Sequence, residues 1–247
     1  MKNAKLNWVR LPLESVENCR ELGGYNTQYG QQTKWHALLR SSDMSKLTEE
    51  DIIFLKEYGV HTVIDLRGAD EIEIKPNGLA NTAFCQYHNI PLITELVSNI
   101  AFTTEKQNMG DLYVELLENN QAIKQIFDCI AHAEEGSIIF HCAAGKDRTG
   151  ILAMLLLSLA GVEKKDILSN YEVSYTNLES MHNLEKLHEK IPVELIYSKS
   201  EYIAKAYDYL RSNYGTVEQY LLAKGVEQDA VMGVRTRLVG KDPVVAV

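Results

Sequence analysis

The sequence predicts an α/β fold in which a central, largely parallel sheet is flanked by helices and followed by additional C-terminal helices. Residues 60–66 and 138–140 are apolar segments with the length of buried strands. Residues 111–133, between them, carry apolar side chains at helical spacing, and an apolar segment of helical length begins at Ile151. The resulting order of strand, helix, strand, loop and helix is typical of α/β proteins.

Further elements are expected on both sides of this unit. Residues 35–40 and 84–92 are predicted strands. Thr48 to Asp51 has the pattern of a capping box, which opens a helix that ends at Gly59. Beyond the central unit the sequence predicts four more helices, over residues 163–178, 201–213, 217–223 and 228–238.

The composition indicates a single domain over residues 1–247, with a core at about 15–175 and a helical extension at 176–247 packed on it. The chain is 45% hydrophobic and 24% charged, which is enough to bury a full core. Its net charge of −9 argues against nucleic-acid binding and against non-specific attraction to anionic membranes. No apolar segment has the length of a transmembrane helix.

The four cysteines (Cys19, Cys85, Cys129 and Cys142) are widely spaced, which suits a reducing compartment. The N-terminus lacks the apolar region of a signal peptide. We therefore expect a cytoplasmic protein, and export stays open if a signal has been removed.

The loop after the predicted strand 138–140 has the features of an anion site. Cys142 and Arg148 are separated by five residues, and the peptide between them includes Ala143, Ala144 and Gly145. So short a loop can turn its backbone N–H groups inward, and the following helix adds its N-terminal N–H groups and positive dipole end. Arg148 adds a forked donor for two phosphate oxygens. We expect a bound phosphate or a similar anion here.

The same surroundings would activate the sulfur. A helix N-terminus and a neighbouring cation favour the thiolate over the thiol, so we expect Cys142 to be ionised at neutral pH. A thiolate beneath a phosphoryl group can displace the ester oxygen and form a phosphocysteine, which water then hydrolyses. This chemistry needs no metal ion and no cofactor.

The loop sequence HCAAGKDRTG, residues 141–150, resembles the signature Cys-x5-Arg-Ser/Thr of the protein tyrosine phosphatase superfamily. Its GKDRTG part is similar to bacterial tyrosine phosphatases that also act on phosphoinositides. NCRELGGY (18–25), LRS (39–41) and VIDLR (63–67) resemble upstream blocks of that family. The resemblance covers most of residues 15–175 and implies a phosphatase fold and activity.

The resemblance implies a phosphorylated protein as the main substrate, with phosphotyrosine first and phosphoserine, phosphothreonine and phosphoinositides as further substrates. Lys146 would meet the extra phosphates of an inositol lipid, and the alternative is a lysine that faces solvent. Phosphoinositide hydrolysis as the main activity and a non-catalytic phosphate-binding module are alternative functions.

The general acid that protonates the leaving oxygen has three candidates. Asp147 lies in the loop and is favoured by the resemblance to the GKDRTG group. Asp111 matches where dual-specificity phosphatases keep their acid, but it also suits a helix cap. Asp65, at the end of a predicted strand, either faces the same crevice or, like Arg67, pairs with neighbours such as Glu71.

Several supporting roles also follow from the sequence. Thr149 either stabilises the leaving thiolate or caps the helix, and His141 is expected to orient the loop backbone. The NCRELGGY block forms either a structural corner or a support in which Asn18 or Arg20 lies behind the loop. The irregular segment 94–107 is interpreted as a lid.

The sequence argues against other functions of such a loop. A nucleotide-binding P-loop needs Gly at position 140 and Ser or Thr at position 147, where this chain has Phe140 and Asp147. The histidines form no zinc-ligand cluster with the cysteines. The upstream blocks and the lack of a resolving cysteine argue against a sulfur carrier or an arsenate reductase.

Overall fold

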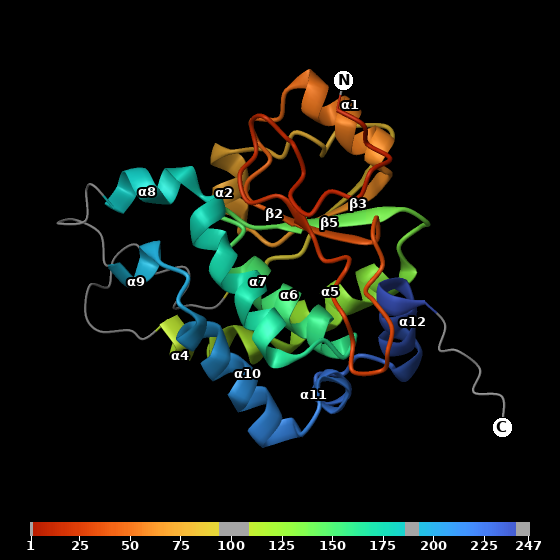
Figure 1. Ribbon diagram of the computed structural model, residues 1–247, viewed down its shortest axis with the longest axis vertical. Coiled ribbons are helices and arrows are strands. Elements are labelled where there is room, and N and C mark those ends of the chain that lie inside the picture. The colour runs from red at the N-terminus through yellow and green to blue at the C-terminus, as the bar shows by residue number, and fades with distance from the viewer. Residues whose placement is uncertain (1, 94–108, 186–192, 241–247) are drawn as a thin grey trace.

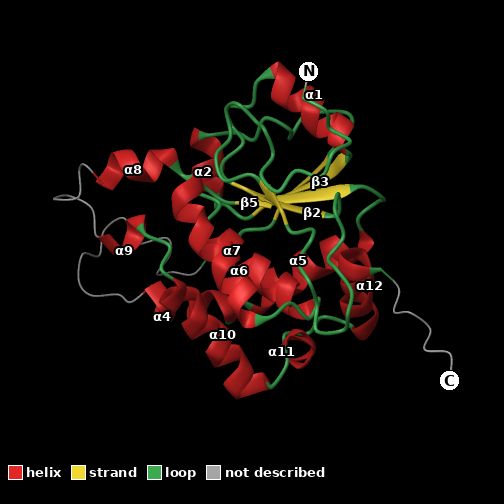
Figure 2. Ribbon diagram, viewed as in Figure 1, coloured by secondary structure: helices red, strands yellow, loops and turns green. Residues whose placement is uncertain are grey.

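A computed structural model describes residues 2–93, 109–185 and 193–240. A five-stranded sheet with the order β1-β2-β5-β3-β4 lies at the centre (Figure 2). β1 pairs antiparallel with β2, and the other pairings are parallel. The strands are β1 (Arg20–Glu21), β2 (Leu38–Ser41), β3 (Val60–Asp65), β4 (Gln86–Asn89) and β5 (Ser137–His141).

Helices cover both faces of this sheet, with α1 and α2 on one side and most of the others on the opposite side (Figure 1). They are α1 (Glu49–Tyr58), α2 (Ala69–Ile74), α4 (Met109–Leu117), α5 (Asn120–His132), α6 (Asp147–Leu159), α7 (Lys164–Asn177), α8 (Glu179–Glu185), α9 (Val193–Ile196), α10 (Ser200–Tyr214), α11 (Val217–Ala223) and α12 (Gln228–Val239). The predicted α/β class, with a largely parallel sheet and added C-terminal helices, is confirmed.

The two faces of the sheet belong to two hydrophobic clusters, as expected from the alternation of side chains along a strand. In β5, Ile138 and Phe140 lie in the larger cluster with α4, α5 and α6, whereas Ile139 packs on the other face. β3 alternates in the same way, with Val63 on the α1 side and Ile64 on the α6 side. β5 is therefore buried on both faces and fixes the position of the loop that follows it.

The predicted start and end of α1 are confirmed. The Thr48 side chain accepts a hydrogen bond from the Asp51 N–H, and Gly59 ends the helix with a φ of 93°. Asp51 does not complete a capping box, because its carboxylate accepts from the N–H groups of Glu14 and Ser15 instead. The Asp51 side chain thus ties the N-terminal segment to α1.

The structure differs from the predicted helix at 111–133, which is two helices. α4 ends at Leu117, and the Asn119 side chain caps α5 by accepting from the Ala122 N–H at 3.1 Å. The short helices α2, α8 and α9 were not predicted. The proposed lid, residues 94–107, lies outside the described residues.

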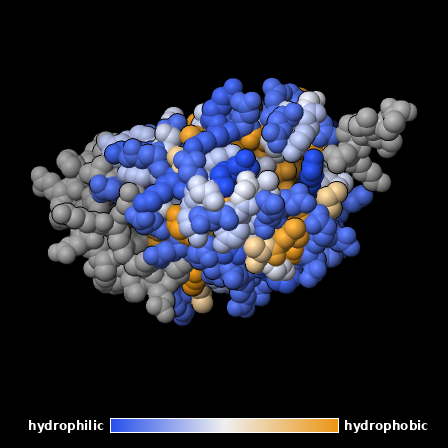
Figure 3. All heavy atoms as spheres, turned by 90° about the horizontal axis from the view of Figure 1, so that it is seen from below, coloured by the Kyte–Doolittle hydropathy of each residue, from blue (hydrophilic) through white to orange (hydrophobic). Residues whose placement is uncertain are grey.

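The C-terminal helices complete the layer below the sheet. α10 packs against α4, and α12 packs against α5 (Figure 1). Their buried residues Ile203, Leu210 and Val234 belong to the same cluster as Phe140. Seen from below, this part of the surface is mostly hydrophilic with small hydrophobic patches (Figure 3). In the described parts of the chain, no helix has the length and apolar character needed to cross a membrane.

Candidate active site

The loop predicted to bind an anion joins β5 to α6. Cys142 directly follows β5, whose parallel neighbours are β2 and β3. α6 begins at Asp147, so its N-terminal N–H groups and its positive dipole end lie beside the loop. Both Cys142 and Arg148 are nearly buried, at 2% and 9% exposure. The strand, loop and helix arrangement expected for this segment is confirmed.

The loop carbonyl groups are held from outside by two buried side chains. The Asn18 Nδ2 donates to the carbonyl oxygens of Ala144 (3.1 Å) and Gly145 (2.9 Å). The Arg40 Nη2 also donates to the Gly145 carbonyl, at 2.7 Å. With the carbonyls fixed outward, the N–H groups of residues 143–145 are left without an acceptor among the described residues. Inward N–H groups of this kind form an anion-binding nest.

A second layer holds these two side chains in place. Arg20 donates to Asn18, and its Nη2 donates to the Asn170 carbonyl of α7 at 2.6 Å. The Arg40 Nη1 donates to the Asn170 Oδ1 at 2.6 Å. Burial lowers the pKa of Arg40 to about 10, and the negative charge of Cys142 opposes that decrease. Arg40 therefore stays positive at neutral pH. The NCRELGGY block thus supports the loop, as one of its two interpretations predicted.

Gly145 occupies a position that other residues cannot. Its φ of +65° is in the left-handed region. A Cβ atom there would also lie 2.7 Å from the Ser42 nitrogen and closer still to the Ser41 carbonyl oxygen. The loop therefore packs directly on the end of β2, and its close approach requires glycine.

Arg148 is held by Glu71 of α2. The Arg148 Nη1 donates to Oε2 at 2.6 Å and Nη2 donates to Oε1 at 2.8 Å. Burial alone would lower the pKa of Arg148, but the hydrogen bonds of Glu71 and the charge of Cys142 raise it above its usual value. Burial alone would raise the pKa of Glu71, but Arg148 lowers it. Both side chains are charged, and the guanidinium has one fixed orientation.

Asp147 is fixed by a pair of buried tyrosines. The Tyr113 hydroxyl of α4 donates to the Asp147 Oδ1, and the Tyr171 hydroxyl of α7 lies 2.6 Å from the Tyr113 hydroxyl. The Asp147 side chain is 30% exposed, so the carboxylate reaches the solvent side of the loop. Of the three candidate acids, Asp147 alone combines a place in the loop with access to a substrate.

Of the two predicted positions of Lys146, the one that faces solvent is wrong, and contact with further substrate phosphates stays a prediction. The side chain is 1% exposed, and its Nζ lies 3.5 Å from the Asp147 Oδ1. Its Nζ donates to the carbonyl oxygens of Leu195 (2.7 Å) and Tyr197 (3.1 Å), at and just after the end of α9. The ammonium needs acceptors once it is buried, and these carbonyls provide them. Lys146 thus ties the loop to the C-terminal helices.

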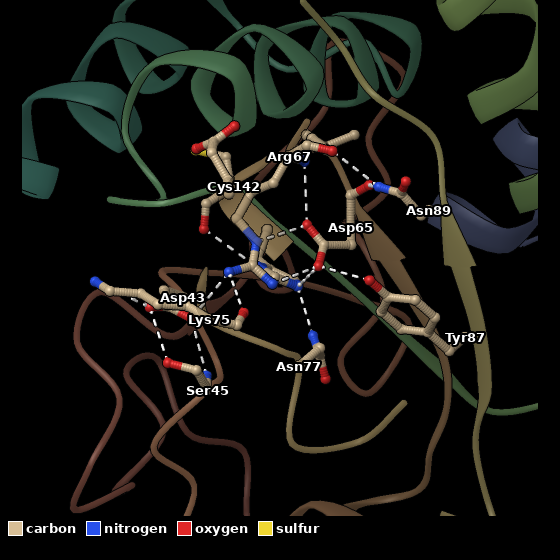
Figure 4. A network of polar contacts seen from close by, with 12 residues as sticks. Asp43, Ser45, Asp65, Arg67, Lys75, Asn77, Tyr87, Asn89 and Cys142 are labelled. Atoms are coloured by element: carbon tan, nitrogen blue, oxygen red, sulfur yellow. Dashed lines mark hydrogen bonds and ion pairs between the residues drawn. The ribbon is translucent and has the colours of Figure 1, made fainter. Parts of the chain in front are cut away.

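Asp65 is a structural residue rather than an acid. Its carboxylate is buried and accepts from the Arg67 Nε and Nη2 at 2.9 and 2.7 Å and from the Tyr87 hydroxyl at 2.9 Å (Figure 4). Burial alone would raise the pKa of Asp65, but the hydrogen bonds and charge of Arg67 hold it well below its usual range. A carboxylate so stabilised carries no proton near neutral pH and is a poor general acid. Asp65 therefore pairs with a neighbour, as one alternative predicted, but the neighbour is Arg67 rather than Glu71.

His141 is a buried support of the loop. Its Nδ1 lies 3.1 Å from the Cys142 carbonyl oxygen, and its Nε2 lies 2.7 Å from the Asn77 Nδ2. The Asn77 Oδ1 accepts from the Leu79 N–H, which fixes the amide and makes Nδ2 the donor. The His141 Nε2 also lies 3.4 Å from the Asp65 Oδ2, so both ring nitrogens have polar partners and the imidazole joins the loop to β3.

Asp111 and Thr149 are the two remaining candidate site residues. Asp111 has a 61% exposed side chain and pairs with Lys205 of α10 at 2.6 Å, which argues against a role as the acid. Thr149 is fully buried, and its hydroxyl has no partner among the described residues. Its predicted contact with the leaving thiolate stays a prediction. In the described part of the chain, no three His, Cys, Asp or Glu side chains are placed to hold a metal ion.

Known proteins are similar to this chain over much of its length. The profile of the tyrosine phosphatase family matches residues 11–240. This chain belongs to the tyrosine phosphatase family. A tyrosine-protein phosphatase of Nostoc commune is 42% identical over 146 residues, which are 58% of this chain and 50% of the relative. The chain thus spans half the length of that relative.

Two more distant matches come from other bacteria. The triple specificity protein phosphatase PtpB of Mycobacterium tuberculosis is 23% identical over 251 residues, which cover 82% of this chain and 91% of the relative. The crystal structure of P. aeruginosa TpbA aligns with a TM-score of 0.40 and 16% identity, over 90% of this chain and 99% of that chain.

Sequence reasoning missed several residues of this family site. Arg40 had one signal, a charge inside an apolar strand, and it lay within a block that resembles the family. Glu71 was considered only as a partner of Asp65 or Arg67. Tyr113 and Tyr171 had no sequence signal, because nothing in a single sequence relates two residues that lie 58 positions apart in two different helices.

Proposed function

We propose that this chain is a cysteine-dependent phosphatase that hydrolyses phosphotyrosine through a phosphocysteine intermediate. The observation that carries the proposal is the position of Cys142 at the start of a loop whose carbonyls are pulled outward by Asn18 and Arg40. The N–H groups that this leaves inside the loop, the N-terminus of α6 and Arg148 together suit the three equatorial oxygens of a phosphoryl group.

In the first step, the sulfur of Cys142 forms a bond to phosphorus while the bond from phosphorus to the ester oxygen breaks. Asp147 gives its proton to the departing oxygen, which leaves as the phenol of tyrosine. Arg148 and the loop N–H groups hold the phosphoryl oxygens while charge shifts among them.

In the second step, a water oxygen attacks the phosphorus of the phosphocysteine. The water proton passes to the carboxylate of Asp147, and the bond between sulfur and phosphorus breaks. Inorganic phosphate leaves, and both the thiolate and the protonated Asp147 are restored.

The substrate range is proposed to start with phosphotyrosine and to extend to phosphoserine, phosphothreonine and phosphoinositides. The match to a relative named a triple specificity phosphatase supports a test of several ester classes. The sequence-based reason for phosphoinositides was Lys146, and its burial against α9 weakens that reason. Phosphotyrosine is therefore placed first.

The test measures phosphate release from phosphotyrosine, phosphoserine and phosphothreonine peptides and from short-chain phosphoinositides, in metal-free buffer with reductant. The Cys142→Ser variant should lose turnover and still bind a phosphotyrosine peptide. Cys85→Ser is the matched control, because burial raises the pKa of Cys85 to about 12 and it lies outside the loop. A non-catalytic binding module would show no release even in the unmodified protein, and that result would refute the proposal.

A further inference from the structure

We propose that Tyr113 is a positioning residue that gives the two oxygens of Asp147 different roles: Oδ1 is held by the protein, and Oδ2 carries the proton used in the reaction. The inference rests on the proposed phosphatase function and on Asp147 as its general acid. It adds a residue of α4, 34 positions before Asp147, to the machinery of the loop.

The polar contacts of the Asp147 carboxylate reach only one of its two oxygens among the described residues. The Tyr113 hydroxyl donates to Oδ1, and the Lys146 Nζ lies 3.5 Å from the same oxygen. Among the described residues, no hydrogen bond reaches Oδ2. A protonated carboxyl has one hydrogen, and an oxygen that already accepts a strong hydrogen bond is the poorer place for it. The reactive proton therefore belongs on Oδ2.

The direction of the hydrogen bonds follows from counting hydrogens. Tyr113 has one hydroxyl hydrogen, and it is given to Asp147. The hydroxyl of Tyr171, 2.6 Å away, must then donate to the Tyr113 oxygen. Burial raises the pKa of both tyrosines well above the usual value, and the negative charge of Asp147 adds to the increase. Both hydroxyls thus remain donors over the whole working pH range.

This chain of donors also acts on the pH dependence. The titratable and charged groups around Asp147 come from its own loop, from α4, from α7 and from β2: Lys146, Arg148, Tyr113, Tyr171 and Arg40. Tyr113 is the group that donates a hydrogen bond directly to the carboxylate. Its removal leaves Oδ1 without that donor, so the carboxyl group can turn and the proton is no longer fixed on Oδ2.

The experiment compares Tyr113→Phe with the unmodified protein, by recording kcat against pH on aryl phosphates with good and poor leaving groups. For the poor leaving group, we expect kcat to fall by about tenfold because the proton on Oδ2 is no longer directed at the leaving oxygen, and the alkaline limb to flatten because the acid contributes less to the rate. For the good leaving group, which needs little protonation, kcat should change little.

Tyr220→Phe is the matched control. It also removes one buried hydroxyl, which donates to the carbonyl of Leu117, the last residue of α4, at 2.7 Å. A general loss of stability would affect both variants alike, whereas a badly placed acid lowers kcat for the poor leaving group and flattens the alkaline limb in Tyr113→Phe alone. An alkaline limb and a leaving-group dependence that are unchanged in Tyr113→Phe would overturn the inference.

Two further variants keep the result decisive. If Tyr113→Phe does not fold, Tyr171→Phe takes its place: a smaller flattening of the alkaline limb supports the inference, and an unchanged limb overturns it. If Asp147→Asn keeps the alkaline limb, the acid assignment and this inference fall together. The phosphatase assignment itself falls on other results: no phosphate release by the unmodified protein, or turnover that Cys142→Ser retains.

Discussion

Glu71 binds the guanidinium of Arg148 end-on, through one hydrogen on each of its terminal nitrogens. This arrangement leaves the edge formed by Nε and the second hydrogen of Nη2 for a phosphoryl group, so one guanidinium can serve two anions. Glu71 belongs to α2, a helix that buries none of its residues. The ion pair is therefore a main link between α2 and the phosphate loop.

Loss of this pair should weaken substrate binding. In Glu71→Gln the side chain can accept one hydrogen bond where the carboxylate accepted two, so Arg148 loses its fixed orientation. We expect kcat/KM for a phosphotyrosine peptide to fall by about ten- to a hundredfold. Glu73→Gln, an exposed residue of the same helix, is the control and should match the unmodified protein. Equal activity of both variants would show that Glu71 has no positioning role.

Gly145→Ala tests how closely the loop packs on β2. A Cβ atom would clash with the backbone of Ser41 and Ser42, so the loop must move and activity should fall by more than about a hundredfold. Gly30→Ala is a matched control, since Gly30 has a φ of +75° and nothing within 4 Å of the added atom. That variant should show only the left-handed backbone penalty of about 1 kcal/mol in the free energy of unfolding, with unchanged kcat. Similar losses in both would contradict the packing argument.

Asp65→Asn should destabilise the fold by about 3 kcal/mol, because the buried Arg67 would keep only its longer ion pair with Asp43, at 3.2 Å. The pKa of Asp65 is held well below its usual value, so its contribution is present at pH values above about 4 and is lost as the pH falls through the folded-state pKa. Urea unfolding of both proteins from neutral to acid pH checks this. The difference in free energy should shrink on acidification, and a difference that grows would contradict the assignment.

Lys146→Met tests the corrected role of the loop lysine. The variant removes the ammonium that holds the Leu195 and Tyr197 carbonyls, so the attachment of the C-terminal helices should weaken. We expect turnover of phosphotyrosine and of short-chain phosphoinositides to fall by equal factors, because the ammonium is already bound to these two carbonyls. A loss confined to phosphoinositides would restore the idea that Lys146 selects them.

The part of the site that lies in one continuous segment could be predicted from sequence. The apolar alternation of Ile138, Ile139 and Phe140, the small residues after Cys142 and the helix start at Asp147 are all local signals. The position of Lys146 could not be predicted, because its acceptors lie 49 and 51 positions further along the chain. For Asp65 the sequence left two alternatives open, because a residue at the end of a strand can face the crevice or pair with a neighbour, and its partner Arg67 is only two positions away.

Some helix boundaries also could not be predicted from the sequence. The apolar spacing of residues 111–133 continues across the break between α4 and α5, so periodicity alone gives one helix. Asn119 is a local cap signal, and it proved stronger than the periodicity. α2, α8 and α9 have four to seven residues, too few for a helical pattern to emerge. Tertiary contacts rather than local sequence hold such short helices.

The central claim is that Cys142 becomes covalently phosphorylated during turnover, and acid quenching tests it most directly. The protein is mixed with an aryl phosphate, quenched within milliseconds, digested, and analysed by mass spectrometry for phosphate on the Cys142 peptide. We predict a phosphocysteine there, absent in Cys142→Ser and unaffected in Cys19→Ser, since burial raises the pKa of Cys19 to about 12 and keeps it a thiol. Turnover with no phosphate on Cys142, or with phosphate on another residue, would contradict the mechanism.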